Sequence, residues 1–143
     1  MTRDALQILI VEDDDGDAMM IREALEAVPG PVTLHRVADG EAALAFLHGN
    51  SDATDDRPDI ILLDLNMPRM DGRQTLVQLK SDPALQSIPV IILTTSDDIR
   101  DISTMYEEHA SAFVTKPLDF DALESVVQQI RQFYEHVAVL PPH

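Results

Sequence analysis

Short apolar runs alternate along the chain with longer segments in which apolar residues recur every three or four positions. The short runs occupy residues 8–11, 32–37, 60–63, 90–93 and 112–114. The runs at 8–11, 60–63 and 90–93 are apolar throughout and rich in β-branched residues, which is typical of strands buried on both faces of a parallel sheet. The run at 32–37 mixes polar and apolar residues, which predicts a strand at the edge of the sheet.

The segments between these runs have the spacing of amphipathic helices. One stripe consists of Ala18, Ile21, Leu25 and Val28, and another consists of Phe120, Leu123, Val127, Ile130 and Tyr134. Helix-ending and helix-capping residues agree with this spacing. They are Pro29-Gly30-Pro31 after the first helix, Asp39 before and Gly49 at the end of the second, and Pro117 and Asp119 before the last. Further helices are predicted near residues 73–80 and 98–109.

Strand and helix therefore alternate in the order βαβαβαβαβα. This order predicts an α/β fold in which a parallel sheet is covered by helices on both faces, with right-handed crossovers. A chain of 143 residues is long enough to form one domain with its own core. We expect a single domain over residues 1–143 with a C-terminal tail at 136–143, and an exposed acidic loop rather than a linker at 49–58.

The composition narrows the classes of function. The chain has 26 acidic and 10 basic residues, a net charge of -16, which repels nucleic acid phosphates and anionic lipid, so we expect neither nucleic acid nor membrane as a partner. The absence of cysteine excludes disulfides and thiolate zinc sites. No apolar run is long enough to span a bilayer, and the N-terminus lacks the apolar core of a signal peptide, so we expect a cytoplasmic protein.

The polar residues that follow the predicted strands carry the candidate chemistry. The carboxyl ends of parallel strands meet at one edge of the sheet, where ligands of open α/β sheets bind. This edge receives Glu12, Asp13, Asp14, Asp64, Asn66, Thr94, Thr95, Ser96, Thr115 and Lys116. Carboxylate and carbonyl oxygens suit Mg²⁺, which would also offset the repulsion between the carboxylates. The lysine would then pair with a bound anion.

Asp64 is the acid that most directly follows a buried strand, and Asn66-Met67-Pro68 comes next. A carboxylate can attack phosphorus as a nucleophile and form an acyl phosphate. The alternative is a strand-end acid that caps the following turn. The presence of Thr94 and Lys116 at the same edge favours the nucleophile.

Four segments of the chain resemble the signature segments of response regulator receiver domains, in order and in spacing. They are ILIVEDD, ILLDLNMPRMDG, IPVIILTTSDD and AFVTKPL. The resemblance covers nearly the whole chain. It implies a doubly wound, flavodoxin-like receiver fold with strand order 2-1-3-4-5.

The resemblance also implies roles for single residues. Asp64 matches the phosphoacceptor, Glu12 and Asp13 match the magnesium-binding acids, and Asn66 matches the position whose main-chain carbonyl binds the metal. The metal ligands implied are thus Glu12, Asp13, Asp64 and Asn66. Glu12 stands where aspartate is common, which lengthens one metal contact and should preserve binding.

A second group of positions is implied to sense the phosphoryl group. Thr94 matches the hydroxyl that moves toward it and Lys116 the lysine that pairs with it, while Thr95 shapes access and Asn66 and Ser96 influence dephosphorylation. Phe113 matches the switch aromatic, although an aromatic residue in this strand fits a plain core role equally well. Pro117 matches a proline whose preceding peptide bond is commonly cis.

The expected function is a phosphorylation switch. A sensor histidine kinase phosphorylates Asp64 with Mg²⁺ as the cofactor, and the change is passed to a downstream protein through altered contacts. We expect no enzymatic activity other than self-directed phosphotransfer and autodephosphorylation. We also expect no output domain after the last helix. A phosphatase would need a second carboxylate where Asn66 stands. A pseudo-receiver that only binds protein would lack an acid, Thr94 or Lys116, and none is missing.

Some features resemble small single-domain regulators that partner bacterial phytochrome-type histidine kinases, which implies such a kinase as partner. These features are Asp17, the segment 49–58 and the ending FYEHVAVLPP. The extra acids Asp14, Asp15 and Asp17 are interpreted as solvated residues without an assigned catalytic role; the alternative is that they influence the magnesium ion through its ligands. The histidines are interpreted as surface residues.

The end of the chain predicts self-association. Apolar residues continue past the usual end of a final receiver helix at Phe133, Tyr134, Val137, Val139 and Leu140, and Pro141-Pro142 prevents further helix. An apolar surface of this kind predicts a homodimer through the fourth and fifth helices and the tail. The alternative is that Val139 and Leu140 fold back on their own domain.

Overall fold

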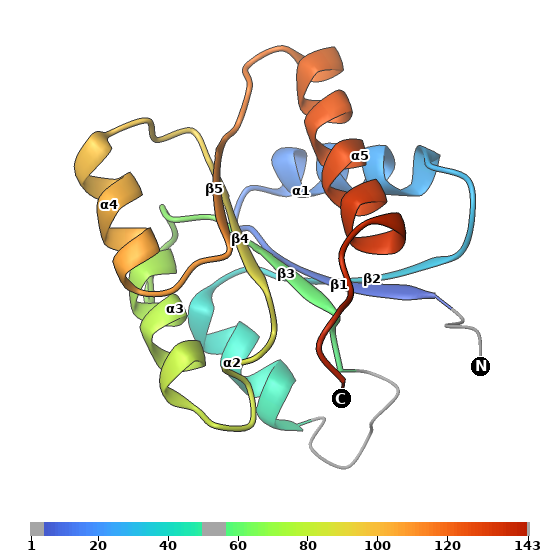
Figure 1. The fold of residues 1–143 in the computed structure, drawn as a ribbon. Helices are drawn as coiled ribbons and strands as arrows, with labels where there is room; N and C mark the ends of the chain where they lie inside the picture. Colours follow the sequence, from blue (N-terminus) through green and yellow to red (C-terminus); the bar gives the residue numbers. More distant parts are fainter. Residues whose placement is uncertain (1–4, 50–56, 143) are drawn as a thin grey trace.

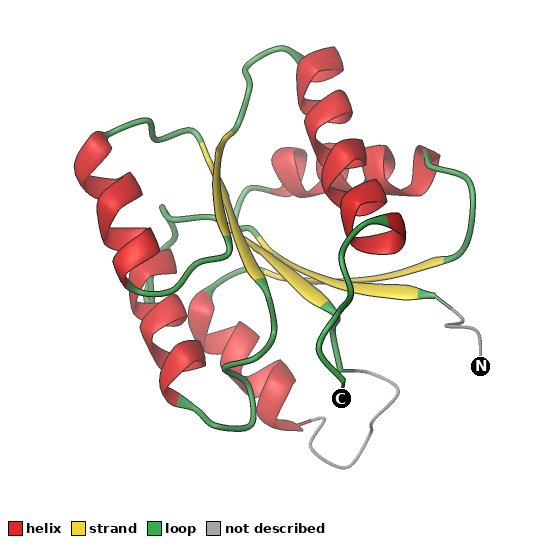
Figure 2. Cartoon of the chain, viewed as in Figure 1, coloured by secondary structure: helices red, strands yellow, loops and turns green. Residues whose placement is uncertain are grey.

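The computed structural model describes residues 5–49 and 57–142, so most of the segment predicted as an exposed loop lies outside the described residues. A five-stranded parallel sheet of order β2-β1-β3-β4-β5 lies between two layers of helices (Figure 1; Figure 2). The strands are β1 (Leu6–Val11), β2 (Val32–Val37), β3 (Ile60–Leu63), β4 (Val90–Thr94) and β5 (Ala112–Thr115). The helices are α1 (Asp15–Ala27), α2 (Gly40–Gly49), α3 (Gly72–Ser81), α4 (Ile99–Glu107) and α5 (Phe120–His136). The predicted fold class and strand order are confirmed.

Alternate residues of the central strands face opposite helix layers. Leu9, Ile61 and Ile92 pack in the layer of α2, α3 and α4, whereas Ile8, Leu62 and Ile91 pack in the layer of α1 and α5. Both faces of β1, β3 and β4 are therefore buried, which explains their continuous apolar sequences. The strand at 32–37 is a half-buried edge strand, as predicted.

The helix boundaries follow their capping residues. The side chain of Asp39 accepts the N–H of Ala42 at 2.8 Å, and that of Asp119 accepts the N–H of Ala122 at 3.0 Å. The fourth helix is shorter than the predicted 98–109, because Asp98 is its N-cap and His109 has a φ of 75°. Side-chain capping at Asp98 and a left-handed residue at His109 thus set the two ends of α4.

Arg131 of α5 is a buried arginine that the sequence pattern did not single out. Its side chain is fully buried, and its Nε donates to Glu135 at 3.0 Å. Its guanidinium also donates to the main-chain carbonyls of Leu25, Val28, Pro29, Gly30 and Pro31. Carbonyls at the end of a helix lack intrahelical partners. Arg131 supplies these partners and thereby joins α5 to the turn after α1.

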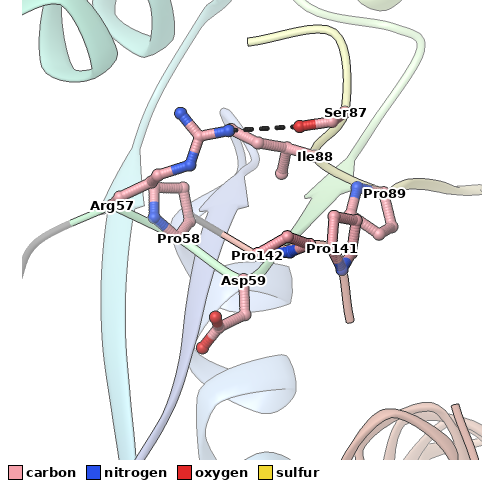
Figure 3. Close-up of a pocket in the computed structure, with 8 residues that line it drawn as sticks. All are labelled: Arg57, Pro58, Asp59, Ser87, Ile88, Pro89, Pro141 and Pro142. Atoms are coloured by element: carbon pink, nitrogen blue, oxygen red, sulfur yellow. Dashed lines mark hydrogen bonds between the residues drawn. The ribbon is translucent and has the colours of Figure 1, made fainter. Parts of the chain in front are cut away.

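The tail after α5 folds back on its own domain. Leu140 and Tyr134 pack against the core layer of α1 and α5, whereas Val139 is 97% exposed. The chain then reaches a small pocket lined by Arg57, Pro58, Asp59, Ser87, Ile88, Pro89, Pro141 and Pro142 (Figure 3). Asp59 and Pro89 precede β3 and β4, so this pocket lies at the amino ends of the strands.

Candidate functional site

Three acids gather at the carboxyl ends of two adjacent strands. Glu12 and Asp13 follow β1, and Asp64 follows β3. The sheet order reverses at this pair, since β2 lies beyond β1 and the later strands lie beyond β3; the ligands of such sheets bind at this position. The N–H of Asp64 donates to the Val11 carbonyl at 3.1 Å, which holds the two strand ends together. One carboxylate oxygen from each acid lies within 4.8 Å of the other two.

The three acids differ in burial. Glu12 and Asp64 are 2% and 8% exposed, whereas Asp13 is exposed. Burial raises the pKa of the Glu12 carboxyl to about 7 against the lowering effect of its hydrogen bond from Lys116, and the charge of Asp64 raises this pKa further. Concentrated negative charge of this kind, presented by oxygen ligands on one face, fits a hard divalent cation.

Lys116 follows the edge strand β5 and brings a buried positive charge to the acids. Its Nζ donates to Glu12 Oε1 at 2.7 Å and to Asp17 Oδ2 at 3.0 Å. Burial acts to lower the pKa of the Lys116 ammonium, but the two hydrogen bonds and the nearby negative charges raise this pKa above its ordinary value. The lysine therefore stays protonated, with its charge directed at the acids.

Three hydroxyl residues lie at the carboxyl end of β4, at the same edge of the sheet. Thr94 is fully buried at the end of β4, and its carbonyl accepts the N–H of Lys116. Thr95 is exposed. Ser96 donates its hydroxyl to Asp101 of α4 at 2.6 Å, which links the β4–α4 loop to the first turn of α4.

Phe113 and Asn66 lie on different parts of this region. Phe113 is half-buried and packs against the core layer of α2, α3 and α4, and its N–H donates to the Tyr106 hydroxyl at 3.1 Å. Asn66 is exposed two residues beyond Asp64. Its side chain is thus available to a molecule that approaches Asp64.

The expected cis bond before Pro117 is not present. All peptide bonds of the described residues are trans, including Lys116–Pro117. The intrinsic preference of an X–Pro bond for trans is only about 0.5–1 kcal/mol. A sequence motif therefore decides this isomer less firmly than it decides the strands.

Two glycines allow close backbone approaches to the segment that follows Asp64. A Cβ on Gly72 would overlap the Asp64 carbonyl oxygen and lie 2.7 Å from the Leu65 Cα. A Cβ on Gly40 would overlap the Thr75 hydroxyl and lie 2.8 Å from the Met70 carbonyl. Only residues without a side chain permit backbone approaches this close.

The structure gives roles to three acids that were interpreted as solvated. Asp14 is the N-cap of α1 and accepts the N–H of Asp17 at 2.8 Å, Asp15 pairs with Arg36 at 2.8 Å, and Asp17 pairs with Lys116. The capping spacing of Asp14 and Asp17 was a signal available in the sequence. The partner of Asp17 lies 99 positions away, and no local pattern indicates it.

Comparison with known proteins agrees with this geometry. A family model of the response regulator receiver domain matches residues 8–128. The response regulator Rcp1 of Synechocystis sp. is 38% identical over 135 residues, which cover 94% of this chain and 92% of Rcp1. Across the described residues, no helix combines the length and apolar character needed to cross a membrane.

Two solved structures of similar proteins have the same fold. The phosphorylated cyanobacterial phytochrome response regulator RcpA has a TM-score of 0.90 and 40% identity, over 96% of this chain and 99% of that chain. The Mn²⁺-bound form of Rcp1 has a TM-score of 0.87 and 38% identity, with the same shares covered. The chain therefore belongs to the response regulator receiver domain family, the phosphoacceptor modules of two-component signalling.

Proposed function

We propose that Asp64 accepts a phosphoryl group from the phosphohistidine of a sensor histidine kinase. The observation that carries this proposal is the convergence of Glu12, Asp13 and Asp64 within 4.8 Å, with Lys116 bonded to the same cluster. An oxygen of Asp64 bonds to phosphorus while the P–N bond breaks, and the electron pair leaves with the imidazole nitrogen. The product is an acyl phosphate. The phosphorylated state of the similar protein RcpA supports this assignment.

Mg²⁺ is the proposed cofactor. The carboxylates of Glu12, Asp13 and Asp64 and the main-chain carbonyl of Asn66 would hold it. When bound, a magnesium ion offsets negative charge on the phosphoryl oxygens. The oxygen-only donor set fits the ion, and the Mn²⁺-bound form of the similar protein Rcp1 supports a divalent cation as cofactor.

The remaining site residues are proposed to sense and time the phosphorylated state. Lys116 pairs with the phosphoryl group, and Thr94 follows its oxygens. Thr95 shapes access, Asn66 and Ser96 influence the rate of dephosphorylation, and Phe113 reports the change to the surface. The hydrogen bond from Ser96 to Asp101 gives this change a direct route to α4.

Labelling by acetyl phosphate tests the proposed function. The chain should gain one phosphoryl group in the presence of Mg²⁺, as measured by intact mass, and should gain none when the metal is chelated. It should not turn over a phosphate ester, because a phosphatase needs a second carboxylate as acid and base and Asn66 stands in that place. Failure to label would support a pseudo-receiver, and turnover would support a phosphatase.

Replacing Asp13 by asparagine should weaken magnesium binding while the fold persists. Asp13 is exposed and contributes one of the three clustered carboxylates, so its loss removes a ligand charge without opening the core. We expect a roughly tenfold or greater loss of affinity, measured by an NMR titration with Mg²⁺. Asp121→Asn, an exposed acid in the first turn of α5, is the charge control. Equal affinities of the two variants would contradict the assignment of Asp13.

The chain is further proposed to act as one receiver domain over residues 1–143, with 136–143 as its tail, in the cytoplasm. A phytochrome-type histidine kinase is the proposed partner, which the phytochrome response regulator RcpA supports. The output is proposed to be altered binding of a downstream protein, with no direct contact to nucleic acid or membrane.

A homodimer through α4, α5 and the tail is also proposed. Apolar side chains remain exposed here: Tyr106 is 49%, Phe133 47%, Val137 69% and Val139 97% exposed. β5 is an edge strand of the sheet and α4 packs beside it, while α5 covers the other face. A surface that runs across this edge would join α4 and α5. Solvent-exposed apolar groups of this kind usually mark an interface.

Replacing Phe133 and Val137 together by glutamate should convert the dimer to a monomer. The free-energy cost of burying two charges without partners would outweigh the gain from burying apolar area at the interface. The dissociation constant of the dimer should therefore rise at least roughly a hundredfold. Light scattering on the intact chain measures the state. Met19→Glu, at a 61% exposed site on α1, is the control outside the proposed surface. Truncation after Glu135 tests the tail separately, and a monomeric intact chain would contradict the interface.

A further inference from the structure

The ammonium group of Lys116 is shared between two carboxylates in the unphosphorylated protein. Glu12 Oε1 lies at 2.7 Å and Asp17 Oδ2 at 3.0 Å from Nζ. Among the hydrogen bonds of the described residues, Nζ has these two acceptors, and Asp64 acts on it through its charge alone. The lysine that would bind a phosphoryl group on Asp64 is thus already bound elsewhere.

The start of α1 places Asp17 for this contact. Asp17 stands in the first helical turn, and its N–H donates to the N-cap side chain of Asp14 at 2.8 Å. This capping hydrogen bond holds the Asp17 backbone in the first turn of the helix. The positive end of the helix dipole also attracts the Asp17 carboxylate toward the start of α1.

The two carboxylates that accept hydrogen bonds from Lys116 differ in their exposure to solvent. The side chain of Glu12 is 3% exposed, whereas that of Asp17 is 30% exposed. Water can replace Lys116 at Asp17 but not readily at buried Glu12. Glu12 is also a proposed metal ligand, and a carboxylate that shares its charge with a cation attracts a lysine less strongly. Asp17 is then the remaining competitor for the lysine.

We infer that Asp17 is a positioning residue that holds Lys116 in the resting site and competes with the phosphoryl group for it. This inference rests on the proposed phosphorylation of Asp64. The ammonium group has three N–H donors, so the competition is for the position of Nζ. The contact to Asp17 opposes a shift of Lys116 toward a phosphoryl oxygen on Asp64, and its strength therefore sets how readily the phosphorylated arrangement forms. Replacing Asp17 by asparagine removes the competing charge and keeps the size of the side chain.

Beryllofluoride, which mimics a phosphoryl group on a carboxylate, is the probe for this competition. In the presence of saturating Mg²⁺, we expect the Asp17→Asn variant to bind it roughly three- to tenfold more tightly than the unchanged chain, since a partly exposed ion pair is worth about 1 kcal/mol. Amide NMR titrations measure the affinities. Asp15→Asn is the matched control, because Asp15 carries the same charge two positions away and pairs with Arg36 instead.

A second pair of variants tests whether the effect passes through Lys116. In a Lys116→Met background, Asp17→Asn should no longer tighten binding, because the lysine for which the two anions compete is absent. An effect that persists there at full size would overturn the inference, as would equal affinities of Asp17→Asn and Asp15→Asn. If the unchanged chain failed to bind beryllofluoride with Mg²⁺, the proposed phosphorylation of Asp64 would itself be overturned.

Discussion

Replacing Asp64 by asparagine is expected to abolish phosphorylation by acetyl phosphate in the presence of Mg²⁺. The amide oxygen carries no negative charge, is a poor nucleophile toward phosphorus and cannot form a stable acyl phosphate. Removal of a catalytic nucleophile reduces rates by about a thousandfold or more. Intact-mass analysis over a time course long enough to label the unchanged chain fully should therefore show no phosphorylated variant.

The matched control is Asp59→Asn at the opposite end of the same strand. Asp59 is also buried, at 4% exposure, and its carboxylate accepts the N–H of Gln7 at 2.8 Å, which an asparagine side chain can still accept. This variant should be labelled like the unchanged chain. If Asp64→Asn were fully labelled and peptide mapping located the phosphoryl group at another acid, the assignment of Asp64 as the phosphoacceptor would be wrong.

Replacing Gly72, a buried residue at the start of α3, by alanine should cause a large loss of stability. The new methyl group would overlap the Asp64 carbonyl and crowd the Leu65 Cα; both are backbone atoms, which cannot rotate away. Overlaps of this kind cost about 3 kcal/mol, or roughly 10 °C in Tm for a domain of this size. Thermal unfolding followed by circular dichroism measures the change. The affinity for Mg²⁺ should fall as well, because the Asp64 backbone must shift.

Gly49→Ala is the control for the glycine substitution itself. A Cβ at Gly49 would meet nothing within 4 Å, and the residue ends α2. Alanine favours helix over glycine, so the free energy of unfolding should stay level or rise by at most about 1 kcal/mol. Tm should therefore not fall. A Gly72→Ala variant as stable as Gly49→Ala would show that the loop after Asp64 has room to adjust.

The strands could be predicted from the sequence because burial on both faces requires apolar residues at consecutive positions. Ile61 and Leu62 face opposite helix layers, so both positions must be apolar and the run is continuous. The gathering of Glu12, Asp13 and Asp64 was predictable for a related reason, since the carboxyl ends of parallel strands share one edge. Here topology alone brings distant residues together.

The features that sequence reasoning missed depend on single long-range contacts. An acid such as Asp17 in a first helical turn looks like a helix-stabilising residue, and its pairing with Lys116 depends on the packed position of a residue that follows β5. Arg131 likewise looks like a surface residue on an amphipathic helix. The prolyl isomer at Pro117 is set by a small energy difference. In each case the deciding interaction leaves no periodic pattern.

The buried guanidinium of Arg131 has a consequence for synthesis on the ribosome. Its acceptor carbonyls at Leu25 and Val28 precede it by 106 and 103 positions. The turn after α1 therefore emerges long before the residue that completes its hydrogen bonds. Until α5 arrives, these carbonyls need water, and α1 cannot be covered by its helical neighbour. We therefore expect the nascent chain to stay sensitive to proteases until α5 has left the exit tunnel, and the domain to fold in one late, cooperative step.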